Sequence, residues 1–192
     1  ARIVQRTRTF DSVATFLDDH DRGLVWGIDQ GNAWWIQPGK TREATTDSDV
    51  TFMLPTVQYF VEMPFRFLEA ELVRYAGPEE VDGVRYERVF VTWRSIEPNA
   101  DFDQYVVYLD PQTGRLARVD YTVREMLGAA SGTGHFEDVR EVDGIWIPHR
   151  IAVSAVGDPA SAWIHDMRIE ALRFDTHDRD TLAPKPGIAP LP

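Results

Sequence analysis

Two stretches of the sequence carry the same turn signal: EEVDGVRYERVFV (residues 79–91) and REVDGIWIPHRIAV (residues 140–153). Each places Val-Asp-Gly before a run that is rich in valine, isoleucine and aromatic side chains. An Asp-Gly pair fits a two-residue type I′ hairpin turn, because glycine adopts a positive φ without a steric penalty. Asp82-Gly83 and Asp143-Gly144 therefore predict two antiparallel hairpins, and their divergent flanks argue against a duplicated domain.

The strand pattern around these hairpins extends along most of the chain. Segments enriched in β-branched and aromatic residues are bounded by Gly, Pro, Asp or Asn, which is typical of strands. Roughly ten such segments cover residues 2–10, 24–28, 33–38, 72–76, 84–93, 102–110, 116–124, 133–142, 145–153 and 163–174. Their joins are short, as in DPQTGR (residues 110–115), and short joins require antiparallel neighbours. The sequence predicts a mainly β fold, a strongly curved antiparallel meander.

One segment, SDVTFMLPTVQYFVEMPFRFLEAEL (residues 48–72), does not alternate. Its apolar residues have helical spacing, and proline is expected to end or kink a helix. We predict two short helices, at about residues 55–62 and 65–70, broken at Pro64. The segment is too apolar to lie in water, so we expect residues 48–71 to form a lid over the concave face of the sheet.

The length of 192 residues suits one domain. We expect a single β domain in residues 1–180. The last twelve residues, TLAPKPGIAPLP (181–192), contain four prolines and predict an extended arm.

Composition excludes several classes of function. A formal net charge of −11 and a pI of about 4.8 argue against a nucleic-acid partner. The absence of cysteine removes disulfides, thiolate catalysis and thiolate zinc sites. No run of 18 apolar residues is present, so no transmembrane segment is expected, and no motif calls for a cofactor.

Two strands, in residues 84–93 and 102–109, are apolar on both faces, which predicts positions inside the sheet with side chains packed on each face. A curved sheet under a short apolar lid tends to leave a cavity lined by aliphatic and aromatic groups. The alternative is that the same side chains simply form a filled core.

Two polar features have their own alternatives. His135, His149 and His165 would fall on neighbouring strands and could form a metal site or a hydrolase, but no HxH or HxxxH spacing supports a metal. A histidine on an apolar face more often belongs to a hydrogen-bonded core. Arg2, Arg6 and Arg8 either protect an edge strand from pairing or contact an anion at a cavity mouth.

Over residues 52–174 the combined pattern resembles the outer-membrane lipoprotein-sorting carriers LolA and LolB. The pieces that carry the resemblance are LPTVQYFVEMPFRFLEA (residues 54–70), YVVYLDPQTGRL (105–116) and EDVREVDGIWIP (137–148). The resemblance implies an incomplete antiparallel β-barrel with helices over its concave side, in which characterised members hold acyl chains. It also implies an exported chain of the periplasm or cell envelope, whose signal segment is not among these residues.

We therefore expect a non-catalytic protein that binds an apolar small molecule or lipid, with an envelope protein as a further partner. The alternative is an interaction module that binds a protein through a sheet edge or the lid. The expected ligand-binding residues are Phe52, Tyr59, Phe60, Met63, Phe65, Phe67, Trp93, Tyr105, Val107, Tyr121, His149 and His165.

Overall fold

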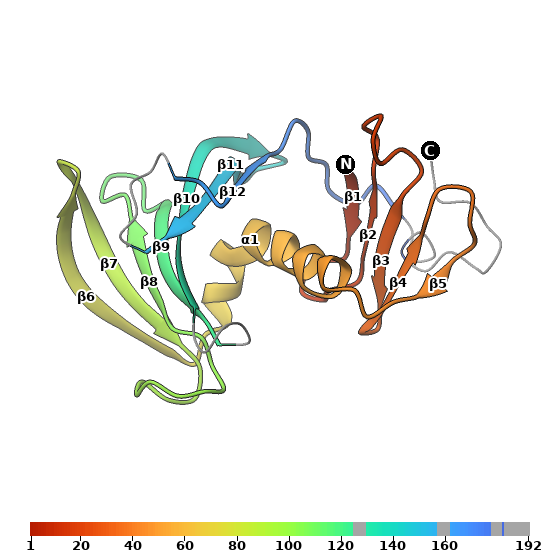
Figure 1. The fold of residues 1–192 in the computed structure, drawn as a ribbon. Helices are drawn as coiled ribbons and strands as arrows, with labels where there is room; N and C mark the ends of the chain where they lie inside the picture. Colours follow the sequence, from red (N-terminus) through yellow and green to blue (C-terminus); the bar gives the residue numbers. More distant parts are fainter. Residues whose placement is uncertain (125–129, 157–161, 178–181, 183–192) are drawn as a thin grey trace. The chain divides into compact units, whose positions relative to one another are not determined.

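The computed structural model describes residues 1–124, 130–156, 162–177 and 182. The chain forms two compact units, one made of Ala1–Met63 with Phe174–Pro192 and the other of Pro64–Arg173. Each unit contains one antiparallel sheet (Figure 1). The expectation of a single domain over residues 1–180 stays a prediction.

The first unit contains a five-stranded sheet in which every strand pairs with its neighbours in sequence. Its strands are β1 (Arg2–Gln5), β2 (Ser12–Thr15), β3 (Val25–Asp29), β4 (Asn32–Ile36) and β5 (Glu43–Ala44). Apolar side chains pack on both faces. One cluster joins Val13, Val25 and Trp34 to Leu182, and the other joins Ala14 and Ile28 to Leu54 at the start of the helix. This sheet is therefore buried between two small cores.

The helical segment is continuous, so the predicted break at Pro64 is wrong. A π-helical turn, η1 (Asp49–Met53), leads into α1 (Leu54–Arg66) and then into a 3₁₀ turn, η2 (Phe67–Glu69). Pro64 lies inside α1. Proline removes one backbone hydrogen bond there, and the burial of Met63 and Phe67 on either side favours continued helix. In the described ranges, no helix combines the length and apolarity that a membrane span requires.

A buried polar contact fastens α1 to the loop after β1. Gln58 is 1% exposed, and its Nε2 donates to the carbonyl oxygens of Arg6 (2.7 Å) and Thr9 (2.5 Å). The side chain of Glu62 accepts from the same amide at 2.9 Å and from the backbone N–H of Arg8 at 3.2 Å. Because each bond satisfies a group removed from water, this contact fixes the path of the loop.

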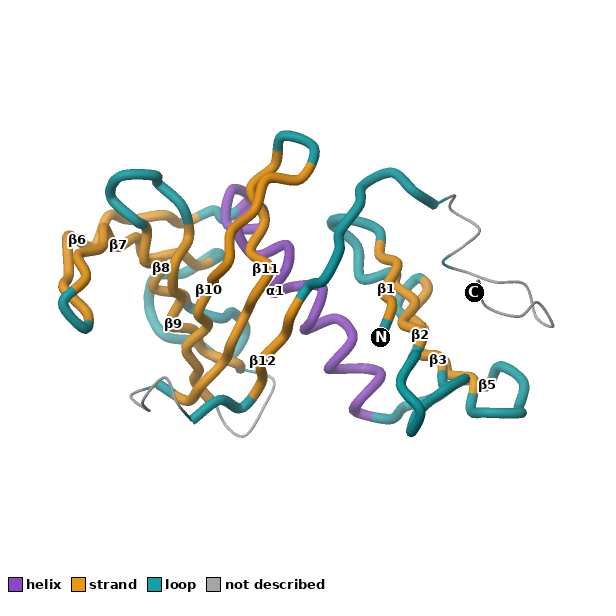
Figure 2. Tube along the Cα trace, turned by 90° about the horizontal axis from the view of Figure 1, so that it is seen from above, coloured by secondary structure: helices purple, strands orange, loops and turns teal. Residues whose placement is uncertain are grey.

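The second unit contains a seven-stranded sheet in the order β12-β11-β10-β9-β8-β7-β6, which curves visibly in Figure 1. Figure 2 shows the long β10–β11 hairpin within it. The strands are β6 (Leu72–Val81), β7 (Val84–Thr92), β8 (Tyr105–Leu109), β9 (Leu116–Val123), β10 (Ala130–Val142), β11 (Ile145–Ala155) and β12 (His165–Arg168).

The predicted turns are confirmed. Asp82 and Gly83 have φ of 54° and 79°, and Asp143 and Gly144 have 51° and 82°, as a type I′ turn requires. These turns join β6 to β7 and β10 to β11. At the β8–β9 turn, Asp110 accepts two backbone hydrogen bonds of 2.8 Å, from Gln112 and Thr113. Those bonds lower the pKa of the Asp110 carboxyl group.

The mainly β, antiparallel and unclosed architecture is confirmed, with one difference. The expected single meander is divided into two sheets, because the helical segment separates β5 from β6 and strands pair only with sequence neighbours. The short strands β2 and β5 were not predicted. β1 is an edge strand and contains Arg2, but it ends at Gln5, so Arg6 and Arg8 of the expected arginine-bearing strand lie beyond it. Of the predicted arm only Leu182 is described, and it is buried against Trp34; the rest lies outside the described residues.

Candidate functional site

The register of the seven-stranded sheet separates its side chains into an apolar face and a polar face. Residues directly opposite each other on paired strands point to the same side of a sheet. Tyr105 lies opposite both Val91 and Tyr121, and Val107 lies opposite Val119. We call this side the apolar face; its buried members include Val91, Tyr105, Val107, Val119, Phe136, Ile147, His149, Ile151 and Val153.

An aromatic cluster lies at one end of the apolar face, with Tyr105 at its centre. The edge-on contacts of Tyr105 are with Phe67 of η2 (centroids 5.1 Å apart) and with Trp93 (5.9 Å). Tyr121 of β9 stacks on the same ring at 6.5 Å with an interplanar angle of 23°. Such arrangements stabilise aromatic groups beyond their burial alone. In this cluster the rings of Phe67 and Tyr105 are buried, and those of Trp93 and Tyr121 are half-buried.

Gly132 makes room for Tyr121. The two residues are directly paired between β10 and β9. A Cβ atom on Gly132 would lie 2.7 Å from the Tyr121 hydroxyl oxygen and 2.8 Å from its Cζ, so the ring occupies the space of the missing side chain. Burial raises the pKa of Tyr121 to about 12, and the nearby charge of Asp103 adds to the effect. Tyr121 is therefore a neutral hydroxyl group on an apolar surface.

Five of the predicted ligand-binding residues lie in the aromatic cluster or directly beside it. Trp93, Tyr105 and Tyr121 form the cluster with Phe67, and Val107 lies one same-face position along β8 from Tyr105. Phe65 belongs to the same unit but is 42% exposed. The first unit contains the remaining lid residues, namely Phe52, Tyr59, Phe60 and Met63. Phe60 and Met63 are buried there. Closure of the lid residues over the sheet stays a prediction.

The three histidines do not form one site. His149 is buried on the apolar face, where its Nδ1 donates to the carbonyl oxygen of Ile147 at 3.0 Å. His165 lies opposite Val153 on β12, on the same side, but is exposed. His135 is paired with Arg118 and Ala152, which places it on the opposite face. Among the described residues no group of three or more His, Asp or Glu side chains could hold a metal ion.

The polar face carries a hydrogen-bonded network that the sequence did not reveal. Asp120 accepts from Tyr108 (2.9 Å), Thr133 (2.7 Å) and Arg118 (2.9 Å). Burial and the hydrogen bond to Asp120 raise the pKa of Tyr108 to about 12. Further along the same face, Arg150 pairs with Asp166 at 3.0 Å and with Glu137.

His135 lies on this face too, its ring edge-on to Trp163 at 5.1 Å. Burial lowers its pKa, and the positive charge of Arg118 contributes in the same direction. The polar and charged side chains of the polar face thus contact one another, and these contacts stabilise that face.

Gly132 is the site residue that sequence reasoning missed. The signal was present in SGTGH (residues 131–135), since glycine inside a strand often marks the close approach of another group. Asp103 was missed as well. Its carboxylate accepts from the backbone N–H of Arg124 (2.8 Å) and from Thr122 (3.2 Å), which ties the end of the β7–β8 connection to β9.

Comparison with known proteins gives matches among solved structures. The fold resembles that of a domain from Vibrio parahaemolyticus designated an outer membrane lipoprotein-sorting protein, with a TM-score of 0.53 and 14% identity over 90% of this chain and 74% of that one. It also resembles a DUF1329 family protein from Desulfovibrio piger, with a TM-score of 0.52 and 16% identity over 89% and 76% of the two chains.

A LolA superfamily protein from Nitrosomonas europaea matches at a TM-score of 0.44 and 11% identity, over 84% of this chain and 73% of that one, which adds no further support. No family model matches the chain, and no curated protein matches it. The prediction is confirmed at the level of the fold: these strands and this helix share the fold of the Vibrio domain.

Proposed function

We propose that this chain is a non-catalytic carrier that binds the acyl chain of a lipid or lipoprotein against the apolar face of its seven-stranded sheet. The observation that carries the proposal is the aromatic cluster of Phe67, Trp93, Tyr105 and Tyr121. These rings adjoin a row of aliphatic side chains that includes Val107 and Val119. The sorting designation of the Vibrio domain, which shares the fold, supports the same ligand class.

The chemistry of the face suits an acyl chain. A methylene group removed from water contributes about 0.8 kcal/mol, so affinity should rise with chain length. Two additional methylenes should tighten binding roughly tenfold while they remain on the apolar face. Burial keeps the Tyr121 hydroxyl group neutral over the physiological range, so this residue adds no charge to the apolar face.

The cellular setting belongs to the same proposal. A carrier of acylated cargo would act in the periplasm or elsewhere in the cell envelope, where an envelope protein would deliver or receive the cargo. We also propose a lid function for Phe52, Tyr59, Phe60 and Met63. Direct contact with the ligand is proposed for Phe65, His149 and His165.

Quenching of tryptophan fluorescence by a brominated fatty acid tests the proposal. Bromine quenches an indole only at short range, so saturable quenching should require Trp93, which contacts Tyr105. Trp93→Phe should remove most of the saturable component. Trp146→Phe is the matched control, because Trp146 is 45% exposed on the opposite face of β11. Equal loss in both variants, or no saturation in the parent chain, would rule out this site.

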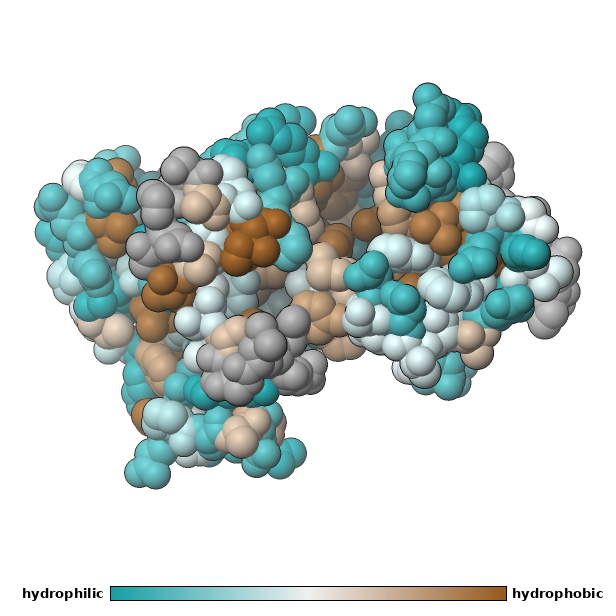
Figure 3. Space-filling view, viewed as in Figure 1, coloured by the Kyte–Doolittle hydropathy of each residue, from teal (hydrophilic) through white to brown (hydrophobic). Residues whose placement is uncertain are grey.

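A sheet-edge interaction is the second candidate function. β6 forms one edge of the seven-stranded sheet, and its Val73 and Tyr75 are 45% and 67% exposed. Apolar residues gather among polar ones on the surface of this unit in Figure 3. A partner strand could pair with the outer edge of β6. Protection of β6 amides from hydrogen exchange by an envelope protein extract would favour this function, and unchanged exchange would count against it.

A further inference from the structure

An ion pair lies on the apolar face of the seven-stranded sheet, towards the β10–β11 turn. Arg140 of β10 lies opposite Ile147 of β11, which is buried on that face. The Arg140 guanidinium donates two hydrogen bonds to Asp138, one of them from Nε at 3.0 Å. At about 3.3 Å per residue, Asp138 lies about 20 Å along β10 from Gly132, which adjoins the aromatic cluster. The apolar side chains of this face are therefore followed along β10 by an ion pair with no net charge.

His149 lies opposite Asp138, because the residue pairs on either side of them are in continuous register. Hydrogen bonds from Arg140 lower the pKa of Asp138, and the nearby His149 contributes in the same direction. Asp138 has a φ of 50°, which residues other than glycine seldom adopt. Such backbone strain is found most often at ligand-binding and active sites.

One ring nitrogen of His149 is left without a partner. His149 is 5% exposed, and its Nδ1 donates to the carbonyl oxygen of Ile147 at 3.0 Å. Because Nδ1 carries the proton, Nε2 of the neutral ring is a hydrogen-bond acceptor. Nε2 forms no hydrogen bond with any residue that the structure describes. Polar atoms in such buried side chains are normally hydrogen-bonded, so His149 offers an acceptor to a ligand on the apolar face.

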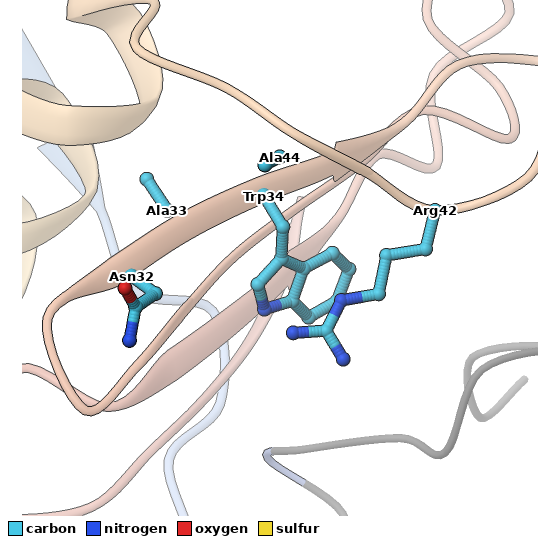
Figure 4. A pocket seen from close by; sticks show the side chains of 5 residues that line it. All are labelled: Asn32, Ala33, Trp34, Arg42 and Ala44. Atoms are coloured by element: carbon cyan, nitrogen blue, oxygen red, sulfur yellow. The ribbon is translucent and has the colours of Figure 1, made fainter.

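The five-stranded sheet carries a hollow of about 230 Å³ whose polar groups are engaged by the protein itself (Figure 4). The guanidinium carbon of Arg42 lies 4.3 Å from the centroid of the Trp34 ring, and Arg42 has further interactions within the chain. The Trp34 ring packs against the backbone of Gly27, and its Nε1–H is buried there. The hollow therefore indicates no ligand, whereas the free acceptor of His149 does.

We propose that His149 recognises the head group of the bound lipid, and that this head group is uncharged and donates a hydroxyl hydrogen bond to His149 Nε2. The inference rests on the proposed function, in which the acyl chain lies on the apolar face. A long acyl chain can bridge the distance between the aromatic cluster and His149. A carboxylate head group has only acceptors, and it would lie beside the negative charge of Asp138. A methyl ester has no donor either.

Three brominated lipids with the same acyl chain test the head-group preference. They are a monoacylglycerol, which has hydroxyl donors, a methyl ester and a fatty acid. Saturable quenching of tryptophan fluorescence gives the affinity of each lipid for the full chain. We expect the monoacylglycerol to bind most tightly, with an advantage over the methyl ester of several-fold and up to about tenfold, as one neutral hydrogen bond provides.

His149→Asn separates the acceptor from the rest of the side chain. The asparagine amide retains an N–H donor for the carbonyl oxygen of Ile147 and removes the acceptor at Nε2. The advantage of the monoacylglycerol should fall below about twofold, while the affinity for the methyl ester stays the same. His135→Asn is the matched control, because it makes the same substitution on the opposite face of the adjacent strand. It should keep the full preference.

NMR provides a second readout that needs no variant to bind lipid. The ¹⁵N resonance of the unprotonated Nε2, assigned among the five histidines with His149→Asn, should move upfield with the monoacylglycerol and stay in place with the methyl ester. Equal affinity for all three lipids, or a preference that survives His149→Asn, would overturn the head-group contact and leave acyl-chain binding standing. If no lipid gives saturable quenching, the proposed function is overturned and this inference falls with it.

Discussion

The two faces of the seven-stranded sheet are built from the same strands but differ in chemistry. One face is apolar, and the other carries ion pairs and hydrogen bonds. On β11, Ile151 is fully buried on the apolar face, and Arg150 beside it forms ion pairs with Asp166 and Glu137 on the polar face. On β10, Gly132 gives its space to the Tyr121 ring, and the adjacent Thr133 donates to Asp120. Since side chains alternate along a strand, residues adjacent in sequence lie on opposite faces of the sheet. Pairs of adjacent substitutions can therefore separate packing and ligand binding from surface electrostatics.

The largest difference should come from Ile151→Ala compared with Arg150→Gln. Truncating a fully buried isoleucine costs about 2–5 kcal/mol, because it removes apolar contacts and leaves a cavity. Arg150→Gln removes partly exposed ion pairs, which contribute little in water. Urea unfolding followed by circular dichroism measures both. Equal losses would show that the polar face also holds the sheet together.

A smaller difference is expected between Gly132→Ala and Thr133→Ala. The new methyl group at residue 132 must displace the Tyr121 ring, which should cost about 1–3 kcal/mol and weaken the saturable quenching by brominated fatty acid. Thr133→Ala removes the 2.7 Å hydrogen bond to Asp120, at a cost of about 1 kcal/mol, and should leave quenching intact. If Thr133→Ala weakened quenching more than Gly132→Ala, the assignment of the faces would be wrong.

The turns and the alternation of the strands could be predicted from sequence, because they depend on neighbouring residues. Asp82-Gly83 and Asp143-Gly144 form the hairpins that their φ preferences require. The division into two sheets could not be predicted, because the pattern of a strand does not show which strand it pairs with. β5 and β6, which flank the helical segment, belong to different sheets. The continuity of α1 through Pro64 was missed because a local helix breaker was outweighed by the burial of Met63 and Phe67.

The aromatic cluster was predicted in part for a similar reason. Tyr105 and Tyr121 were both among the expected ligand-binding residues, and the register places them opposite each other. The opposed faces of His135 and His149 could not be derived from either strand alone, because they depend on how β10 and β11 pair. The buried N–H of Trp34 likewise depends on its packing against Gly27.

A pH dependence at alkaline pH is expected from one tyrosine on each face. The pKa values of Tyr121 and Tyr108 are raised to about 12, from an ordinary value of 10.0. Because the folded chain holds these two protons more tightly than the unfolded chain, the stabilisation is complete below pH 10 and is lost as the pH rises towards 12. Absorbance at 295 nm should show late tyrosine ionisations that include those of Tyr121 and Tyr108.

Tyr121→Phe and Tyr108→Phe should each remove one of the late steps. Titration of the chain in urea is the control, because all the tyrosines should ionise near their ordinary pKa once the fold is lost. An acyl ligand should delay the Tyr121 step alone. A ligand that delayed the Tyr108 step instead would place binding on the polar face.

Native mass spectrometry tests acyl-chain binding to the apolar face most directly. The full chain, purified from bacteria without detergent, is measured beside Trp93→Ala and its matched control Trp146→Ala. We expect the parent chain and Trp146→Ala to carry adducts of lipid mass, and Trp93→Ala to lose most of them. A parent chain that carries no lipid and takes up none from added fatty acid would contradict the proposed function.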